Sequence, residues 1–370
     1  MQSANRSYTS EVEQDHTILL TGPAQIRLAK GTADSFAAPI KMDTWIAIGE
    51  LRQQPILAKS YCVFEIKTGR GGSWKEVNET TIPKGWEEAA HVVQRQNGVV
   101  VIVGDVDSGK SSLCGFVANM CLLEGLRVGI VDGDVGQTDV GPATTISSSH
   151  PTESILSLQD LHPEISFFAG DTSPSLVPDK VIQSIVRLKN NIAKNTDVVL
   201  VNTDGWVADS TARRFKENLL HEIQPDLVLG LSREGEIDPL LDIIQFASLR
   251  LATSRYARTR SKDERKSARE AGYRRFLAGS SLARINQDAT SLRMFHRPSQ
   301  SILRWERKFR GFLAGLLDKD QRLMSVGRIR EISDGNAWVE TTAIEDPTFL
   351  EVGNIVLSSS YEEVGYGILH

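Results

Sequence analysis

The stretch VVVIVGDVDSGKSS, residues 99–112, decides the fold class of this chain. Its first five residues are β-branched and apolar, and such a run between two glycines is typical of a buried strand. Gly104 to Ser111 then match the complete GxxxxGK[ST] pattern of a phosphate-binding loop. After the loop, apolar residues recur at helical spacing at Leu113, Phe116, Val117, Met120 and Leu123. A strand, a loop and a helix in this order predict the first unit of a P-loop α/β domain.

The loop predicts a site for a nucleoside triphosphate. Backbone N–H groups at the start of the following helix would point at phosphate oxygens, where the helix dipole favours negative charge. We expect Lys110 to contact the β- and γ-phosphates and Ser111 to bind Mg²⁺. An ordinary glycine turn is the alternative, and the strand and helix on either side disfavour it. The residues predicted to cradle the nucleotide are Gly104, Asp105, Val106, Asp107, Ser108, Gly109, Lys110, Ser111 and Ser112.

Two carboxylates follow the next apolar run, in the segment IVDGDVGQ at residues 130–137. They lie where open α/β sheets bind ligands, at the carboxyl end of a strand. We assign Asp132 to the Mg²⁺ shell and Asp134 to accepting a proton from an attacking hydroxyl group. The reverse assignment stays open, as does a turn role for both residues. Asn202-Thr-Asp-Gly lacks the lysine of a guanine-binding Asn-Lys-x-Asp, which disfavours a GTPase switch.

Composition excludes several classes of protein. The 370 residues are 40% hydrophobic and 24% charged, which is ordinary for globular domains and excludes a disordered chain. No apolar run approaches the ~18 residues of a membrane span, and the first residues lack a signal-peptide core. We therefore expect a soluble intracellular protein, cytoplasmic if prokaryotic, with no membrane contact. Three cysteines without a CxxC pair predict buried free thiols.

Charge is distributed unevenly along the chain. The net charge is −5, yet residues 250–310 carry 17 Lys and Arg against 5 Asp and Glu. This basic segment therefore has a charge of +12, and the remainder has −17. A basic stripe on an acidic body suits a site that grips a polyanion. A solvated helix surface is the alternative interpretation.

The order of the patterns predicts three folded parts. Short β segments occur at residues 17–21, 24–28, 44–48 and 61–67, before a connecting helix at 86–96. Apolar runs at 99–103, 127–132, 165–169, 197–202 and 226–231 then alternate with helical stretches, which predicts a parallel sheet covered by helices. The basic segment has helical composition to about residue 317. We predict an α/β protein with a flexible arm (1–16), an N-terminal β-domain (17–95), a P-loop domain (96–317) with a basic helical lid at about 255–275, and a C-terminal β-containing domain (318–370).

Four elements together resemble the polynucleotide 5′-hydroxyl kinase family. This family includes the RNA kinase subunit of the mRNA 3′-end cleavage factor and the nucleolar pre-ribosomal RNA kinases. The elements are the P-loop with Asp107, Asp132-x-Asp134-x-Gly136-Gln137, Thr203-x-Gly205-Trp206 and Arg260-x4-Arg265-x3-Arg269. Their order and the flanking β-domains extend the resemblance over nearly the whole chain, whose length is similar to that of the shorter archaeal-type members.

The resemblance implies an ATP- and Mg²⁺-dependent kinase that phosphorylates the 5′-hydroxyl end of RNA or DNA. It implies catalytic roles for Lys110, Asp134 and the lid residues Arg260, Arg265 and Arg269, and acceptor binding by Gln137, Thr203, Gly205 and Trp206. The spacing of the arginines places them near one face of a helix, and guanidinium groups suit a transferring phosphoryl group. Trp206 either stacks on a base or packs in the core.

Two other functions stay open. An ATP-binding scaffold of an RNA-processing complex would carry the same nucleotide site without transferring phosphate. A P-loop kinase or ligase for a small metabolite would not need the basic segment. The sequence identifies no protein partner.

Overall fold

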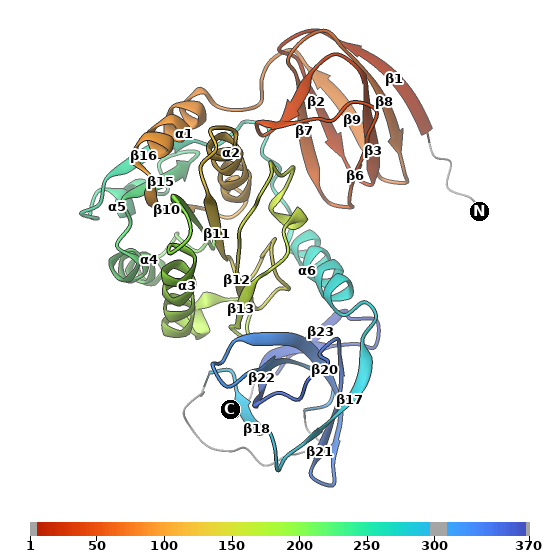
Figure 1. Ribbon diagram of the computed structural model, residues 1–370, viewed down its shortest axis with the longest axis vertical. Helices are drawn as coiled ribbons and strands as arrows, with labels where there is room; N and C mark the ends of the chain where they lie inside the picture. Colours follow the sequence, from red (N-terminus) through yellow and green to blue (C-terminus); the bar gives the residue numbers. More distant parts are fainter. Residues whose placement is uncertain (1–5, 297–308, 368–370) are drawn as a thin grey trace.

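The computed structural model describes residues 6–296 and 309–367. They form an N-terminal β-sandwich, a central α/β domain and a C-terminal β-domain (Figure 1). The predicted fold class, a P-loop sheet domain flanked by two β-domains, is confirmed. No helix in these described ranges is long and apolar enough to cross a membrane.

The central sheet has seven strands in the order β13-β12-β11-β14-β10-β15-β16. Five of them pair in parallel: β10 (Gly98–Gly104), β11 (Val128–Gly133), β14 (Val198–Thr203), β15 (Leu227–Ser232) and β16 (Ser248–Ala252). At one edge, β12 (Thr145–Ser149) pairs antiparallel with both β11 and β13 (Ile165–Phe168). The expected strand at 165–169 therefore exists, but it joins the sheet through a serine-rich antiparallel strand that the pattern did not predict.

Helices cover both faces of this sheet, which explains why its inner parallel strands are mainly apolar. Alternate residues of β10 enter two different cores: Val100 and Ile102 in one, Val101 and Val103 in the other. The first core contains α1 (Lys84–Gln96) and α2 (Lys110–Leu123); the second contains α3 (Pro178–Ile192) and α4 (Ser210–Ile223). The short α5 (Asp238–Leu241) follows β15, and single 3₁₀ turns lie at Leu158–Asp160 and Pro174–Leu176. Cys114 and Cys121 are buried in the first core as free thiols, and Cys62 is buried in the sandwich.

The N-terminal domain packs a four-stranded sheet, β1-β8-β3-β6, against a five-stranded sheet, β5-β4-β7-β2-β9. The strands are β1 (Arg6–Val12), β2 (Thr17–Thr21), β3 (Ala24–Lys30), β4 (Ala33–Ser35), β5 (Ala38–Pro39), β6 (Trp45–Ile48), β7 (Gln53–Ala58), β8 (Cys62–Thr68) and β9 (Ser73–Val77). The expected flexible arm at 1–16 is wrong for residues 6–12. These residues form β1, which pairs with β8 along its whole length and buries Val12 completely. Residues 1–5 lie outside the described ranges.

The C-terminal domain begins earlier than expected. Its sheet has the order β17-β21-β20-β19-β22-β18, with β23 paired to β22. The strands are β17 (Ser281–Asn286), β18 (Ser291–Met294), β19 (Phe312–Leu317), β20 (Leu323–Ser333), β21 (Asn336–Thr341), β22 (Phe349–Leu357) and β23 (Glu363–Tyr366). The expectations of helix to residue 317 and of a boundary at 318 are therefore wrong. A buried apolar run such as β19 fits a helix or a strand equally well, and pairing with β20 and β22 makes it a strand.

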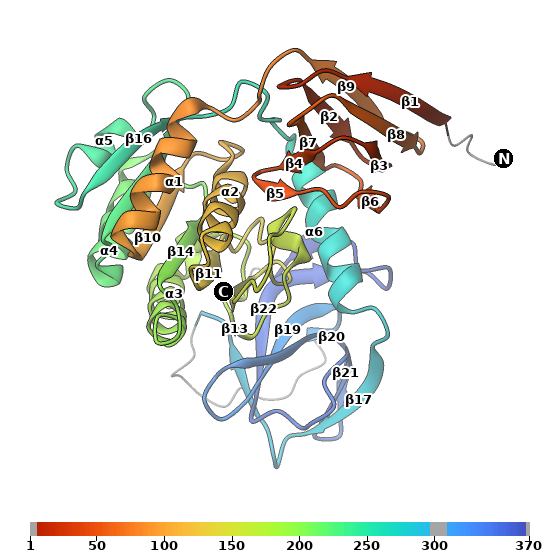
Figure 2. The same cartoon turned by 45° about the horizontal axis from the view of Figure 1, so that its top comes forward.

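Between these domains runs α6 (Lys262–Phe276), the helix of the basic segment (Figure 2). It begins at a capping box, because the Ser261 hydroxyl and the Glu264 carboxylate each accept the other residue's backbone N–H. Arg260 precedes this cap and is not part of the helix. The expectation that all three lid arginines share one helix face is therefore wrong for Arg260.

Candidate active site

The phosphate-binding loop joins β10 to α2 directly. Gly109 adopts the left-handed conformation (φ 99°) at the N-cap of α2, a position that glycine accepts without strain. No side chain caps the N-terminus of α2. Its first backbone N–H groups are therefore available to an anionic ligand, at the end of the helix where the dipole is positive.

Lys110 lies folded against the loop, with only 6% of its surface exposed. Its Nζ donates to the carbonyl oxygens of Gly104 at 3.1 Å and Asp105 at 2.7 Å. Burial lowers the pKa of Lys110, and the nearby carboxylate of Asp134 acts in the opposite direction. The Ser108 hydroxyl is buried in the same loop without a hydrogen-bond partner. The loop thus holds the Lys110 ammonium, which donates to carbonyl oxygens rather than to a carboxylate, and the unsatisfied Ser108 hydroxyl. A phosphate group would satisfy both.

Asp132 and Ser111 are connected by an amide that the sequence analysis did not assign to the site. The Asn202 Nδ2 donates to Asp132 Oδ1 at 3.1 Å and to Ser111 Oγ at 3.3 Å. The other carboxylate oxygen of Asp132 accepts from the Thr138 hydroxyl at 2.8 Å and from the Asp139 backbone at 2.7 Å. Burial, followed by the charge of Asp139, raises the pKa of Asp132 to about 6. Asn202 Oδ1 is buried without a partner, so this cluster has an acceptor available for a hydrated cation.

Asp134 has a different environment from Asp132. Its Oδ1 accepts from the backbone N–H groups of Gly136 at 3.2 Å and Gln137 at 2.9 Å, which fixes the carboxylate. Burial raises the pKa of Asp134, whereas the Lys110 ammonium acts to lower it. Asp134 lines the same cavity as Lys110, and Asp132 does not. The structure thereby separates the two carboxylates: Asp134 faces the cavity, and Asp132 is linked to Ser111 through Asn202.

The cavity has a volume of about 250 Å³ and lies over the P-loop. Besides Asp134 and Gln137, its walls include Arg258 and Arg260 before α6 and residues 51–55 of the N-terminal sandwich. Gln54 joins the two domains there, since its amide donates to Ser35 of the sandwich at 2.6 Å and to the Leu156 carbonyl at 2.8 Å. Sequence patterns do not indicate this wall, because it depends on how the sandwich docks on the P-loop domain.

The Thr203-x-Gly205-Trp206 element packs beneath the loop. Thr203 is fully buried and donates its hydroxyl to the Ile102 carbonyl at 2.8 Å. A Cβ atom on Gly205 would lie 2.7 Å from the backbone of Val106, so only glycine lets the P-loop approach so closely. Trp206 is half-buried, stacks on Phe215 with ring centroids 5.7 Å apart and donates to Asp209 at 2.9 Å. The structure shows how Thr203, Gly205 and Trp206 pack beneath the loop. Acceptor binding by these residues stays a prediction.

A buried ion pair next to this element was also missed. Lys216 of α4 is fully buried and donates to Asp204 Oδ2 at 2.8 Å and to the Asp204 carbonyl at 2.9 Å. The second oxygen of Asp204 accepts from the Trp206 backbone at 2.9 Å. This pair fixes the carboxyl end of β14 against α4. A lysine in a helix pattern gives no sign that it is buried, so the sequence could not indicate it.

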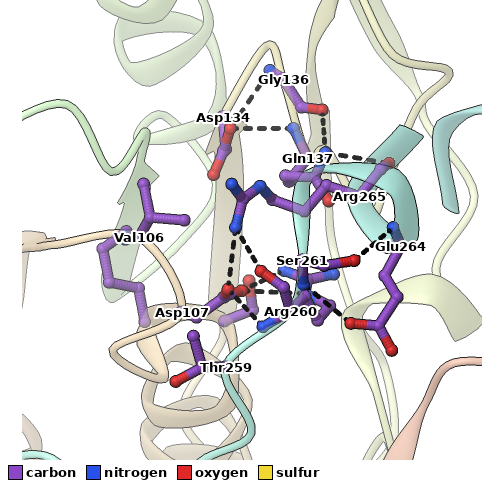
Figure 3. A network of polar contacts seen from close by, with 12 residues as sticks. Val106, Asp107, Asp134, Gly136, Gln137, Thr259, Arg260, Ser261, Glu264 and Arg265 are labelled. Carbon is purple, nitrogen blue, oxygen red and sulfur yellow. Dashed lines mark hydrogen bonds and ion pairs between the residues drawn. The ribbon is translucent and has the colours of Figure 1, made fainter. Parts of the chain in front are cut away.

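Two of the predicted lid arginines meet the P-loop at Asp107 (Figure 3). The Asp107 carboxylate is 2% exposed and accepts from the Arg260 backbone at 2.9 Å, Arg260 Nε at 2.8 Å and Arg265 Nη1 at 3.3 Å. Arg265 also donates to the Arg260 carbonyl at 2.6 Å, and its own carbonyl lies 3.4 Å from the Gln137 amide. The loop, the acidic element and the start of α6 are thus one hydrogen-bonded network.

Arg269 is not part of this network. Its Nε and Nη2 donate to the two carboxylate oxygens of Glu363 in β23, each at 2.6 Å. The structure therefore brings Arg260 and Arg265 to the phosphate-binding loop but joins Arg269 to the C-terminal domain. Catalysis by Arg269 remains a prediction from the resemblance alone.

The loop, the carboxylate behind Ser111 and the cavity-facing Asp134 define a P-loop nucleotide-binding protein. Residues 104–279 match the family model described as the mRNA cleavage and polyadenylation factor CLP1 P-loop. Over this segment the chain is similar to the CLP1 P-loop family, and the resemblance to the polynucleotide 5′-hydroxyl kinase family is confirmed.

Relatives from archaea support the same family. The chain is 33% identical over 192 residues to a polyribonucleotide 5′-hydroxyl-kinase of Pyrococcus horikoshii. The aligned residues make up 52% of this chain and 53% of that protein. It is 30% identical over 188 residues to one of Methanocaldococcus jannaschii, covering 50% and 52%. The chain thus spans about half the length of the curated relatives it matches.

A solved structure extends the comparison to the whole fold. The structure of the wild-type Clp1p–Pcf11p (454–563) complex matches with a TM-score of 0.76, covering 96% of this chain and 99% of the matched chain. Sequence identity over this match is 11%, so the comparison shows that the fold is shared.

Proposed function

We propose that this protein is an ATP- and Mg²⁺-dependent polynucleotide 5′-hydroxyl kinase. The observation that carries the proposal is the placement of Asp134 and Lys110 on the same cavity, over the N-terminus of α2. A γ-phosphate held by the lysine and the helix N-terminus would face a hydroxyl group held by the carboxylate. A nucleotide-binding loop alone would not require that second group.

The donor occupies the part of the cavity nearest the P-loop. Its phosphates lie on the backbone N–H groups that no side chain caps, and Lys110 turns from the carbonyl oxygens of Gly104 and Asp105 to phosphate oxygens. Tyr256 and residues 51–55 line the rest of the cavity, where the nucleoside would lie. A donor in this position touches two domains.

Ser111, with Asp132 behind it, would hold Mg²⁺. Magnesium usually takes one or two protein ligands besides phosphates and water, so it needs no preformed cluster of acidic residues. In the described parts of the chain, no group of three or more His, Cys, Asp or Glu side chains is arranged to hold a metal ion. The unpartnered Asn202 Oδ1 and the linked Asp132 and Ser111 oxygens fit such a hydrated ion. The ion, when bound, neutralises charge on the β- and γ-phosphates.

Asp134 would act as the base for the acceptor hydroxyl. The proton moves to the carboxylate as the hydroxyl oxygen forms its bond to the γ-phosphorus, and the bond to the bridging oxygen of the leaving ADP breaks. Hydrogen bonds from Gly136 and Gln137 hold the carboxylate in place. Its raised pKa makes it a stronger base than an exposed aspartate.

Arg260 and Arg265 are the arginines that would stabilise charge on the transferring phosphoryl group. Both lie at Asp107, three residues before Lys110, and Arg260 lines the cavity. The guanidinium group is planar and permanently charged, so it can donate two hydrogen bonds at once to phosphoryl oxygens. We propose RNA as the preferred acceptor, because the archaeal relatives are named as polyribonucleotide kinases and the basic segment suits a polyanion.

Phosphate transfer is tested directly with γ-labelled ATP and Mg²⁺. The acceptors are matched RNA and DNA oligonucleotides that carry either a 5′-hydroxyl or a 5′-phosphate, and a panel of nucleosides. We expect label only on the 5′-hydroxyl oligonucleotides, with RNA the better acceptor. ATP binding without transfer to any acceptor would instead support the scaffold function. Transfer to nucleosides but not to oligonucleotides would support a metabolite kinase.

A further inference from the structure

Helix α6 is attached at both ends, to the P-loop at its start and to the C-terminal domain near its end. The first attachment consists of Arg260 and Arg265 on the Asp107 carboxylate. It is reinforced by an ion pair between Arg258 and Glu264 and by the capping box at Ser261. The position of this end of the helix therefore decides where Arg260 and Arg265 lie.

The second attachment is centred on Glu363 of β23. Its two carboxylate oxygens accept from Arg269 at 2.6 Å each, and the Tyr273 hydroxyl lies 3.3 Å from one of them. The backbone N–H of Glu363 donates to the Glu270 carboxylate at 2.9 Å. The Arg269 and Glu363 side chains are 13% and 4% exposed, and Tyr273 is fully buried.

Such a contact is costly to open. A bidentate guanidinium–carboxylate pair is among the strongest polar contacts in proteins, and removing one partner leaves the other charge buried and unpaired. To reach a nucleotide phosphate, Arg269 would have to leave Glu363 in that state. Arg269 follows Arg265 by four residues, about one turn of helix or 6 Å along the axis. A shift at Arg269 is therefore transmitted along a rigid helix to Arg265.

We propose that Arg269 is a positioning residue and that Glu363 of the C-terminal domain sets the place of Arg260 and Arg265 through it. This inference rests on the proposed kinase function, and it changes the role that the resemblance implied for Arg269. The C-terminal sheet is then part of the catalytic apparatus, although none of its described residues lines the cavity. Arg269 holds the helix, and Arg260 and Arg265 act on the phosphoryl group.

Exchanging the charges of Arg269 and Glu363 distinguishes a positioning role of Arg269 from direct contact with phosphate. We expect Glu363→Gln and Arg269→Gln each to lower kcat on the order of 10- to 100-fold, with little change in the KM for ATP, because misplaced arginines affect the chemical step. The double variant should be no worse than either single variant. Arg269→Glu combined with Glu363→Arg should recover at least part of the activity lost in Arg269→Glu.

Direct phosphate contact by Arg269 gives the opposite pattern. Glu363→Gln would then retain wild-type kcat, and the exchanged pair would be as inactive as Arg269→Glu. Either result overturns the proposal. Glu362→Gln and Asp263→Asn are matched controls, because both carboxylates are exposed, Glu362 directly before β23 and Asp263 in the first turn of α6, and both variants should behave as wild type.

Amide hydrogen exchange tests the attachment without any kinase assay. Glu363→Gln should increase exchange along α6 in the absence of nucleotide, while exchange in α1 and α2 stays unchanged. Unchanged exchange in α6 would overturn the proposal even if kcat falls. Absence of phosphate transfer by the wild-type chain would refute the proposed function alone, since faster exchange in α6 would still demonstrate the attachment.

Discussion

Lys110 is buried in the nucleotide-free loop at some cost, since desolvation disfavours its ammonium group. Lys110→Ala should therefore not lower the melting temperature, yet it removes the charge that, in the proposed function, would face the γ-phosphate. We expect kcat/KM for ATP to fall by at least about 100-fold. Transfer of label at the wild-type rate would contradict the assignment of this loop to the donor phosphates.

Asp134→Asn keeps the shape of the side chain and removes its ability to take a proton. We expect ATP binding, measured by calorimetry, to be retained, and kcat to fall by roughly 100- to 10,000-fold. A loss of ATP affinity instead would assign Asp134 to the metal shell and make Asp132 the candidate base.

The raised pKa of Asp134 also predicts a pH dependence. The base works only when deprotonated, so kcat should fall as the pH decreases through a value above the usual range of aspartate. This acidic limb should be missing from the residual activity of Asp134→Asn. A wild-type profile that is flat down to the ordinary aspartate range would contradict the assignment.

Gly205→Ala tests the close packing under the loop. The added methyl group would lie 2.7 Å from Val106, so the P-loop must shift, at a cost of about 1–3 kcal/mol. We expect weaker ATP binding and a lower melting temperature. Gly365→Ala is the control, because a Cβ there meets nothing within 4 Å.

At the scale of secondary-structure elements, β14 and α4 are fixed to each other by Asp204 and Lys216. Lys216→Ala leaves the Asp204 carboxylate buried without its charged partner, which should lower the free energy of unfolding by about 3–5 kcal/mol. Urea denaturation measures this change. Lys194→Ala, at an exposed lysine beyond α3, should change stability by less than about 0.5 kcal/mol.

Elements that depend on local pattern were predictable, and elements that depend on distant pairing were not. The predicted strand at 17–21 and the strand, loop and helix around Lys110 coincide with the structure, because periodicity and loop chemistry are contained in each segment. β1 and β19 were missed because neither segment decides its own conformation. β1 needs β8, which lies some fifty residues further along the chain, and β19 needs β20 and β22.

At the scale of the whole molecule, the central and C-terminal domains share one core. Phe168 of β13 and Leu313 of β19 belong to the same buried cluster, and Gly315 and Gly353 approach Phe168 so closely that added Cβ atoms would lie 2.6 and 3.0 Å from its ring. The N-terminal sandwich has a separate core around Ile18 and Phe64. The central sheet joins this cluster to the core on its other face, so the described residues form two packing units, the sandwich and the other two domains together.

Hydrogen exchange in increasing urea should reveal these two units. We expect β13, β19 and β22 to become exposed to exchange together, and the strands of the sandwich to do so at a different urea concentration. Phe168→Ala should shift the first transition and leave the second where it is. Separate transitions for β13 and β19 would contradict a shared core.

The sequence by itself determined the phosphate-binding loop, the order of the domains and the pair of carboxylates at the carboxyl end of β11. Each of these depends on a few neighbouring residues, whose spacing alone decides where a strand ends and which groups reach a phosphate. Asp107 could be named as a site residue for the same reason, whereas the arginines were named from the family resemblance.

Only the tertiary structure decided how these residues divide their roles. Asn202 links Ser111 to Asp132 because β14 pairs beside β11, and residues 51–55 close the cavity because the sandwich docks on it. Arg269 separates from Arg265 because Glu363 lies against α6, ninety-four residues further along the chain. The physical reason is that a charged side chain is placed by its buried partner, and the partner's position in the sequence carries no information about its position in space.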